Sequence, residues 1–97
     1  MVPRAKRLTP AQVLGARVRA LRENLGDRQL DLARRAKKHA TYISRLEAGK
    51  INPSLNALVD IAVALDVDPA TLVADIHPRD LRSHRRPKRP PNDEIAP

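Results

Sequence analysis

The sequence contains no cysteine, tryptophan or phenylalanine, and Tyr42 is its single aromatic residue. Without cysteine the chain forms neither disulfides nor thiolate metal sites, so its fold must depend on apolar burial, which suits a reducing cytoplasm. One aromatic residue cannot supply the stacking surfaces on which modules for single-stranded nucleic acids rely. A nucleic-acid partner is therefore expected to be double-stranded.

Long apolar runs are also missing from the chain. The runs present extend over a few residues, whereas a membrane-spanning helix needs about 20 and a secretory signal needs an apolar core near the N-terminus. We expect a soluble, cytoplasmic protein with no membrane partner. Its 97 residues suffice for one small domain with tails.

Residue groups that carry catalysis are likewise absent from the sequence. The histidines, His39, His77 and His84, are spaced in a way that suits no metal site. Paired carboxylates, a nucleophile with its base and a glycine-rich phosphate loop are all missing. We therefore expect a protein that is not an enzyme and uses no metal or cofactor.

Acidic residues are too few to balance the basic ones, and the two signs are sorted along the chain. Lysine and arginine number 19 against 11 acids, a net charge of +8. Residues 28–50 carry seven bases and two acids, a net +5, whereas residues 51–76 carry four acids and no base, a net −4. A surface that served solubility alone would mix the signs, so this sorting indicates a face that binds a polyanion.

Apolar residues recur at helical spacing in five segments, and the alternation typical of strands appears nowhere, which predicts an all-α fold. The predicted helices cover residues 10–25, 28–36, 40–48 and 55–65, with a short last helix that starts at Pro69 and includes Leu72, Val73 and Ile76. Their expected N-terminal caps are Thr9 (with Gln12 completing a capping box), Asp27, Ser54 and Asp68. The fourth segment should be the most deeply buried, through Leu55, Leu58, Ile61, Ala62 and Leu65.

The composition also predicts where the folded domain ends. Residues 1–9 form a basic, flexible arm, with Arg4, Lys6 and Arg7 and no acid. Residues 10–76 hold all the predicted helices. Residues 77–97 are basic and rich in proline, a composition that buries nothing and predicts a disordered tail.

The second and third predicted helices are short, lie about three residues apart and resemble a helix-turn-helix, whose second helix enters the major groove of DNA. Several stretches of the chain resemble the Cro/C1 (XRE) helix-turn-helix family of bacterial and phage transcriptional regulators: Leu14–Arg22, Gln29, Leu32-Ala33, Tyr42–Gly49 and Asn52–Leu55. The match continues without gaps to about Leu72. This resemblance implies a compact, five-helix, lambda-repressor-like DNA-binding domain.

The resemblance also implies roles for residues of the second and third helices. The positions where the family reads bases are Ala40, Thr41, Ser44 and Arg45; an ordinary solvated helix face is the alternative for the last three. An arginine can bond guanine in a bidentate manner, which supplies roughly 1–3 kcal/mol of discrimination, whereas Ala40 offers only a methyl contact to thymine.

The DNA backbone is expected to be contacted by a second set: Arg28, Gln29, Lys38, His39, Tyr42, Lys50 and Asn52. Gln29 would also brace the recognition helix. For His39 a substitute helix cap is an equal alternative, and Tyr42 is as well suited to packing on its neighbours as to donating to a phosphate. The family pattern further implies a salt bridge between Arg22 and Glu47.

The chain departs from the family pattern in one stretch. Asp27 stands where the family has a buried aliphatic residue, Lys37 where it has a turn glycine, and Lys38 where it has a core aliphatic residue such as valine. These departures concern the stability of the helix-turn-helix and whether specific binding is kept.

The leading functional hypothesis is a homodimeric repressor that binds a short inverted repeat in double-stranded DNA. A second is an antitoxin that binds DNA for autoregulation and a toxin through its tail. A third is a non-specific DNA-binding or coactivator-type module, and polymerase is a further candidate partner for the tail. Comparing operator with random DNA at one salt concentration separates the first hypothesis from the third.

Overall fold

The computed structural model describes residues 8–74 and 76, which form five α-helices and no strand. The helices are α1 (Pro10–Asn24), α2 (Gln29–Ala36), α3 (Ala40–Glu47), α4 (Leu55–Leu65) and α5 (Pro69–Val73). The all-α prediction is confirmed, and the first four helices end within one residue of their predicted bounds. Residues 1–7 and 77–97, which include most of the predicted arm and the whole tail, lie outside the described residues.

Three of the four N-terminal caps predicted from the sequence, those at Thr9, Ser54 and Asp68, are confirmed by short-range hydrogen bonds. Thr9 and Gln12 form a reciprocal capping box, with Gln12 N at 3.1 Å from Thr9 Oγ1 and Thr9 N at 2.9 Å from Gln12 Oε1. Ser54 and Asp68 accept from backbone N–H groups at the starts of α4 and α5. The prediction of Asp27 as the cap of α2 is wrong, because the helix begins one residue later with Arg28 as its N-cap.

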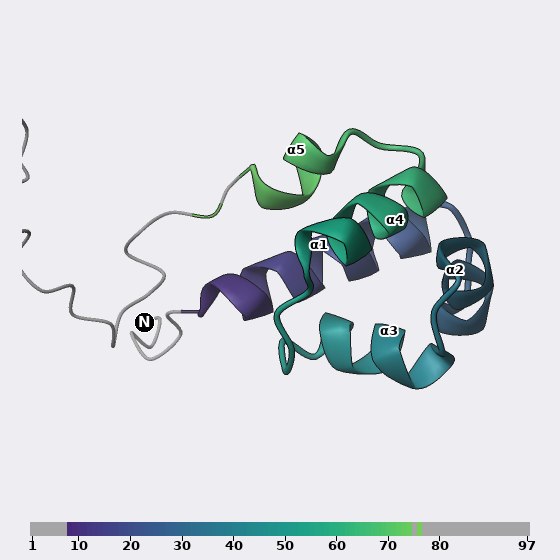
Figure 1. Ribbon diagram of the computed structural model, residues 1–97, viewed down its shortest axis with the longest axis horizontal. Coiled ribbons are helices and arrows are strands. Elements are labelled where there is room, and N and C mark those ends of the chain that lie inside the picture. Colours follow the sequence, from purple (N-terminus) through teal and green to yellow (C-terminus); the bar gives the residue numbers. More distant parts are fainter. Residues whose placement is uncertain (1–7, 75, 77–97) are drawn as a thin grey trace, which may run out of the picture.

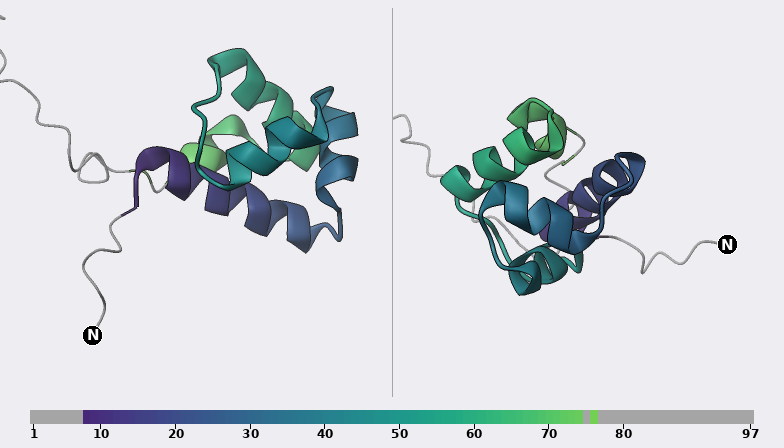
Figure 2. Two further views of the ribbon diagram at one scale, coloured as in Figure 1. Left: turned by 90° about the horizontal axis from the view of Figure 1, so that it is seen from below. Right: turned by 90° about the vertical axis from the view of Figure 1, so that its right-hand side faces the viewer.

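The core lies where the helices face one another (Figure 1). Its largest fully buried side chains come from all five helices: Val18, Leu32, Ile43, Leu46, Ile61 and Leu72. α3 packs on α1 and α2, while α5 packs on α4 and α1. As a result α3 and α5 lie on opposite sides of the described domain (Figures 1 and 2).

Helix α4 has a buried face and an exposed apolar face. It buries five residues, Ala57, Ile61, Ala62, Ala64 and Leu65. Leu55 was expected in the core, but it is 73% exposed and forms an outer row with Val59 and Val63, since residues four apart share a helix face. The last helix is also shorter than predicted: α5 ends at Val73, and Ile76 packs against the core from beyond it.

Helices α1 and α3 approach each other closely at Gly15. A methyl group at this position would lie 2.4 Å from the carbonyl oxygen of Leu46 and 2.7 Å from that of Glu47. Both oxygens belong to backbone, which cannot rotate away as a side chain can. Glycine therefore allows the end of α3 to rest directly on α1.

Candidate nucleic-acid interface

Residues 37–39 connect α2 to α3 and fix the angle between the two helices. Lys37 has φ 57° and ψ 45°, the left-handed conformation in which glycine usually ends a helix. This conformation lets the next N–H, that of Lys38, donate to Ala33 O at 2.8 Å. The position therefore has the geometry that the family pattern implies, although a lysine occupies it.

The outer face of α3 presents three polar side chains, those of Thr41, Ser44 and Arg45, all of them exposed. Ile43 and Leu46 hold the opposite face in the core. Within residues 8–74 and 76, the structure gives none of the three outer side chains a hydrogen bond or an ion pair. Their donors and acceptors are therefore free to bind a ligand in the solvent.

Ala40 and Tyr42 lie differently from these three residues. Both are partly buried and pack against the core cluster. The structure thus separates Ala40 from the other three predicted base readers, since part of its surface already contacts the protein. For Tyr42 it shows the packing that was one of the two expected roles.

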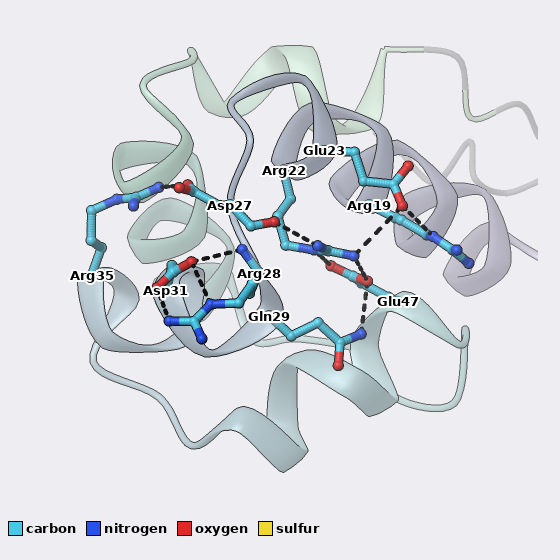
Figure 3. A network of polar contacts seen from close by, with 9 residues as sticks. All are labelled: Arg19, Arg22, Glu23, Asp27, Arg28, Gln29, Asp31, Arg35 and Glu47. Carbon is cyan, nitrogen blue, oxygen red and sulfur yellow. Dashed lines mark hydrogen bonds and ion pairs between the residues drawn. The ribbon is translucent and has the colours of Figure 1, made fainter.

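A network of polar contacts fixes the recognition helix α3 to α1 and α2 (Figure 3). Arg22 Nε and Nη2 donate to the two carboxylate oxygens of Glu47 at 2.6 and 3.0 Å, so the expected salt bridge is present. Gln29 Nε2 donates to Glu47 Oε1 at 2.9 Å, and Arg22 Nη1 donates to Asp27 O at 2.7 Å. Hydrogen bonding to Glu47 raises the pKa of Arg22. The last turn of α3 is therefore held by side chains from two other helices.

The other residues predicted to contact the DNA backbone fall into two groups. His39, Lys50 and Asn52 are exposed. Arg28 is also exposed, but its guanidinium donates to both carboxylate oxygens of Asp31, at 3.2 and 3.0 Å. These contacts, together with the Arg28 backbone N–H, lower the pKa of Asp31 to about 2.

Gln29 and Lys38 have protein partners as well. The Gln29 amide donates to Glu47, and the Lys38 ammonium lies 3.2 Å from Asp60 Oδ2 on α4. Lys38 is only 23% exposed. The structure therefore places both side chains in contacts that stabilise the helix-turn-helix itself.

One anchoring residue was missed by sequence reasoning. Arg35 is exposed, and its Nε and Nη2 donate to Ala64 O near the end of α4 at 3.0 and 2.9 Å. The same guanidinium pairs with Asp27, which is why a charged residue can occupy a position where the family has an aliphatic one. The sequence gives no signal for this bond, since its acceptor is a backbone carbonyl 29 residues away.

A short helix with a free polar face, held at a fixed angle on a second short helix, is the arrangement by which helix-turn-helix proteins bind DNA. The chain matches the family described as helix-turn-helix domain over residues 13–74, and it belongs to this family. It is of the Cro/C1 type, a class of DNA-binding transcription regulators.

Solved structures of three proteins are similar to the described fold. The restriction-modification controller protein C.AhdI from Aeromonas hydrophila is 34% identical, with a TM-score of 0.63, over 64% of this chain and 94% of the other. The clp gene regulator ClgR from Corynebacterium glutamicum is 28% identical, with a TM-score of 0.64, over 67% and 84%.

The third is the hypothetical transcription factor NHTF from Neisseria, which is 31% identical, with a TM-score of 0.64, over 72% and 78%. A search of curated proteins found no match. The family and these structural neighbours are DNA-binding transcription regulators, and double-stranded DNA is the ligand of the class.

Among the described residues, no helix has the length and apolar character needed to cross a bilayer. The same part of the chain holds no group of three or more histidine, cysteine, aspartate or glutamate residues that could bind a metal ion.

Proposed function

We propose that this protein is a homodimeric transcriptional repressor that acts in the cytoplasm and reads a short inverted repeat through α3. The observation that carries the proposal is the free outer face of α3, where Thr41, Ser44 and Arg45 are exposed. Hydroxyl and guanidinium groups are suited to the donors and acceptors of base edges in the major groove. Arg45 is the residue that we expect to contribute most to specificity.

The fixed orientation of α3 supports specific reading. Base readout requires side chains that are held in a defined place, which a mobile helix does not provide. Glu47, whose side chain is 4% exposed, anchors the C-terminal turn of α3 through Arg22 and Gln29. Gly15 lets the same turn sit against the backbone of α1.

The distribution of charge supports the proposed docking face. The acidic residues Asp66 and Asp68 lie in the segment between α4 and α5, and α5 lies on the opposite side of the domain from α3 (Figure 2). A phosphate backbone repels carboxylates and attracts exposed bases such as Lys50. The domain would therefore bind the duplex with α3 facing the DNA.

Footprinting on the DNA upstream of the gene tests the proposal, followed by titration of the protected site and random DNA at one stated salt concentration. We expect a protected inverted repeat and a clear preference for it. Equal affinity for random DNA would instead indicate a sequence-independent module. A toxin partner, which would involve residues 77–97 outside the described part, is tested separately by co-purification with neighbouring gene products.

The contribution of Arg45 is tested by Arg45→Ala. We expect operator affinity to fall by about 1–3 kcal/mol and the preference at one base pair to relax, because a bidentate contact is lost. Lys50→Ala is the matched control, since this exposed lysine is proposed to contact phosphate and should weaken binding to all sequences alike. An equal loss on both DNAs for Arg45→Ala would assign Arg45 to the backbone instead.

A further inference from the structure

Lys38 contacts three helices, α3 and α4 through its side chain and α2 through its backbone. Its ammonium is 3.2 Å from Asp60 Oδ2 in the middle of α4. It is also 5.8 Å from the ring centroid of Tyr42 in the first turn of α3, within the range of a cation–π contact. Its own backbone N–H is bonded to Ala33 O of α2 at 2.8 Å. One residue thus connects α2, α3 and α4.

These contacts converge on the N-terminal turn of α3, where bases are read. Lys38 directly precedes His39, the N-cap of α3. Tyr42, whose ring faces the ammonium, is next to Thr41 on the outer face of the helix. The C-terminal turn of α3 is fixed by Glu47, as described above, but Glu47 lies two turns away from this end. Lys38 supplies a corresponding attachment at the beginning of the helix.

We propose that Lys38 is a positioning residue for the recognition helix and not a contact to the DNA backbone. Its charge is bound within the protein by Asp60, so the ion pair as a whole presents no net positive charge to a phosphate. A lysine that contacts DNA releases condensed counterions, which makes binding salt-dependent. Lys38 releases none, and its effect on binding passes through the placement of Thr41. This inference rests on the proposed function for what α3 reads.

Four variants test the proposal: Lys38→Met, which keeps the apolar stem; Asp60→Asn; the double variant; and Lys38→Arg. Lys50→Gln is the control, because Lys50 is exposed and its side chain has no hydrogen-bond or ion-pair partner among the described residues. Binding of each to operator and random DNA is measured over a range of salt concentrations. Thermal melts confirm that each variant is folded at the assay temperature.

We expect Lys38→Met and Asp60→Asn each to weaken operator binding by about two- to fivefold, the range that a partly exposed ion pair supports. Each single variant leaves one charge of the pair uncompensated, so its salt slope should change by much less than one, and the double variant should bind random DNA as the wild type does. The double variant should be no weaker than either single variant, because both remove the same contact. Lys38→Arg should keep operator affinity, and Lys50→Gln should lower the salt slope by about one on both DNAs.

Other outcomes would overturn the assignment of Lys38. If Lys38→Met lowers the salt slope by about one and weakens both DNAs equally, Lys38 contacts phosphate. If Asp60→Asn tightens binding to both DNAs, Asp60 only restrains a lysine that DNA would otherwise attract. If neither variant changes binding, the contact does not position α3. If Lys38→Met fails to fold, the result for Asp60→Asn alone tests the proposal. Asp60 is 53% exposed, so its replacement by asparagine should leave the domain folded.

The proposed function can fail separately from this inference. A wild-type protein that shows no preference for the operator over random DNA would disprove specific repression. The salt slopes of Lys38→Met and Lys50→Gln would still differ if Lys38 is bound within the protein.

Discussion

Lys37 is a residue whose backbone conformation disfavours its own side chain. At φ 57° and ψ 45° a residue with a β-carbon is disfavoured by about 1–2 kcal/mol, whereas glycine adopts the conformation freely. We expect Lys37→Gly to raise the free energy of unfolding by about 1 kcal/mol, because the greater freedom of glycine in the unfolded chain offsets part of the gain. Urea denaturation measures the change.

Asp66→Gly is the matched control for this substitution. Asp66 ends α4 in nearly the same conformation, with φ 61° and ψ 43°, but aspartate tolerates the left-handed region better than lysine. Its replacement should therefore stabilise less. A lower unfolding midpoint for Lys37→Gly would show that Lys37 makes contacts worth more than the backbone strain.

Asp31 should make the stability of the domain depend on pH in the acidic range. Its pKa is lowered from 3.8 to about 2 by the Arg28 side chain and backbone N–H. Because the folded pKa lies below the unfolded one, the stabilisation is present above about pH 4 and is lost as the pH falls toward 2. In Asp31→Asn this component should be missing. The difference in unfolding free energy between wild type and variant should therefore shrink between pH 4 and pH 2, and a constant difference would contradict the assignment.

At the scale of elements, one carboxylate holds together three helices. Glu47 on α3 accepts from Arg22 on α1 and Gln29 on α2, and both charged side chains are largely buried, at 4% and 10% exposed. Removing one partner of a buried pair leaves the other charge without compensation, at a cost of about 3 kcal/mol or more. Glu47→Ala should therefore lower the free energy of unfolding by about this amount, measured by chemical denaturation.

The control for Glu47 is the exposed pair between Arg19 and Glu23 on α1, whose side chains are 63% and 55% exposed. Glu23→Ala should cost less than about 1 kcal/mol, because exposed ion pairs contribute little. Similar costs for the two substitutions would mean that burial of the Glu47 pair is not what stabilises the junction of α1, α2 and α3.

At the scale of the whole molecule, the proposed dimer makes a geometric prediction. In the proposed dimer each α3 helix would read one half-site, so two half-sites should be protected about one helical turn apart, roughly 34 Å centre to centre. Hydroxyl-radical footprinting on the operator measures this spacing, and analytical ultracentrifugation of the protein–DNA complex gives the number of chains. Protection of a single asymmetric half-site by one chain would contradict the dimer.

The sequence by itself determined the helices and the outer face of α3. The caps at Thr9 and Ser54 and the opposed positions of Ile43 and Thr41 follow from interactions between residues within one or two turns of each other. Such contacts form in the same way wherever the helix is packed. For this reason the sequence pattern predicts the helix bounds and the exposure of the expected base-contacting residues on α3, with the exception of Ala40.

Only the tertiary structure decided which charged residues have a hydrogen-bond or ion-pair partner within the protein. Lys38 and Asp60, like Arg35 and the carbonyl of Ala64, are brought together by the packing of α2 on α4. Leu55 is exposed because none of the five described helices covers that side of α4, although its spacing matches the buried residues. The local sequence pattern specifies which face of a helix is apolar, but it does not specify which helix packs against that face. The packing partner depends on how segments remote in the sequence come together in one core.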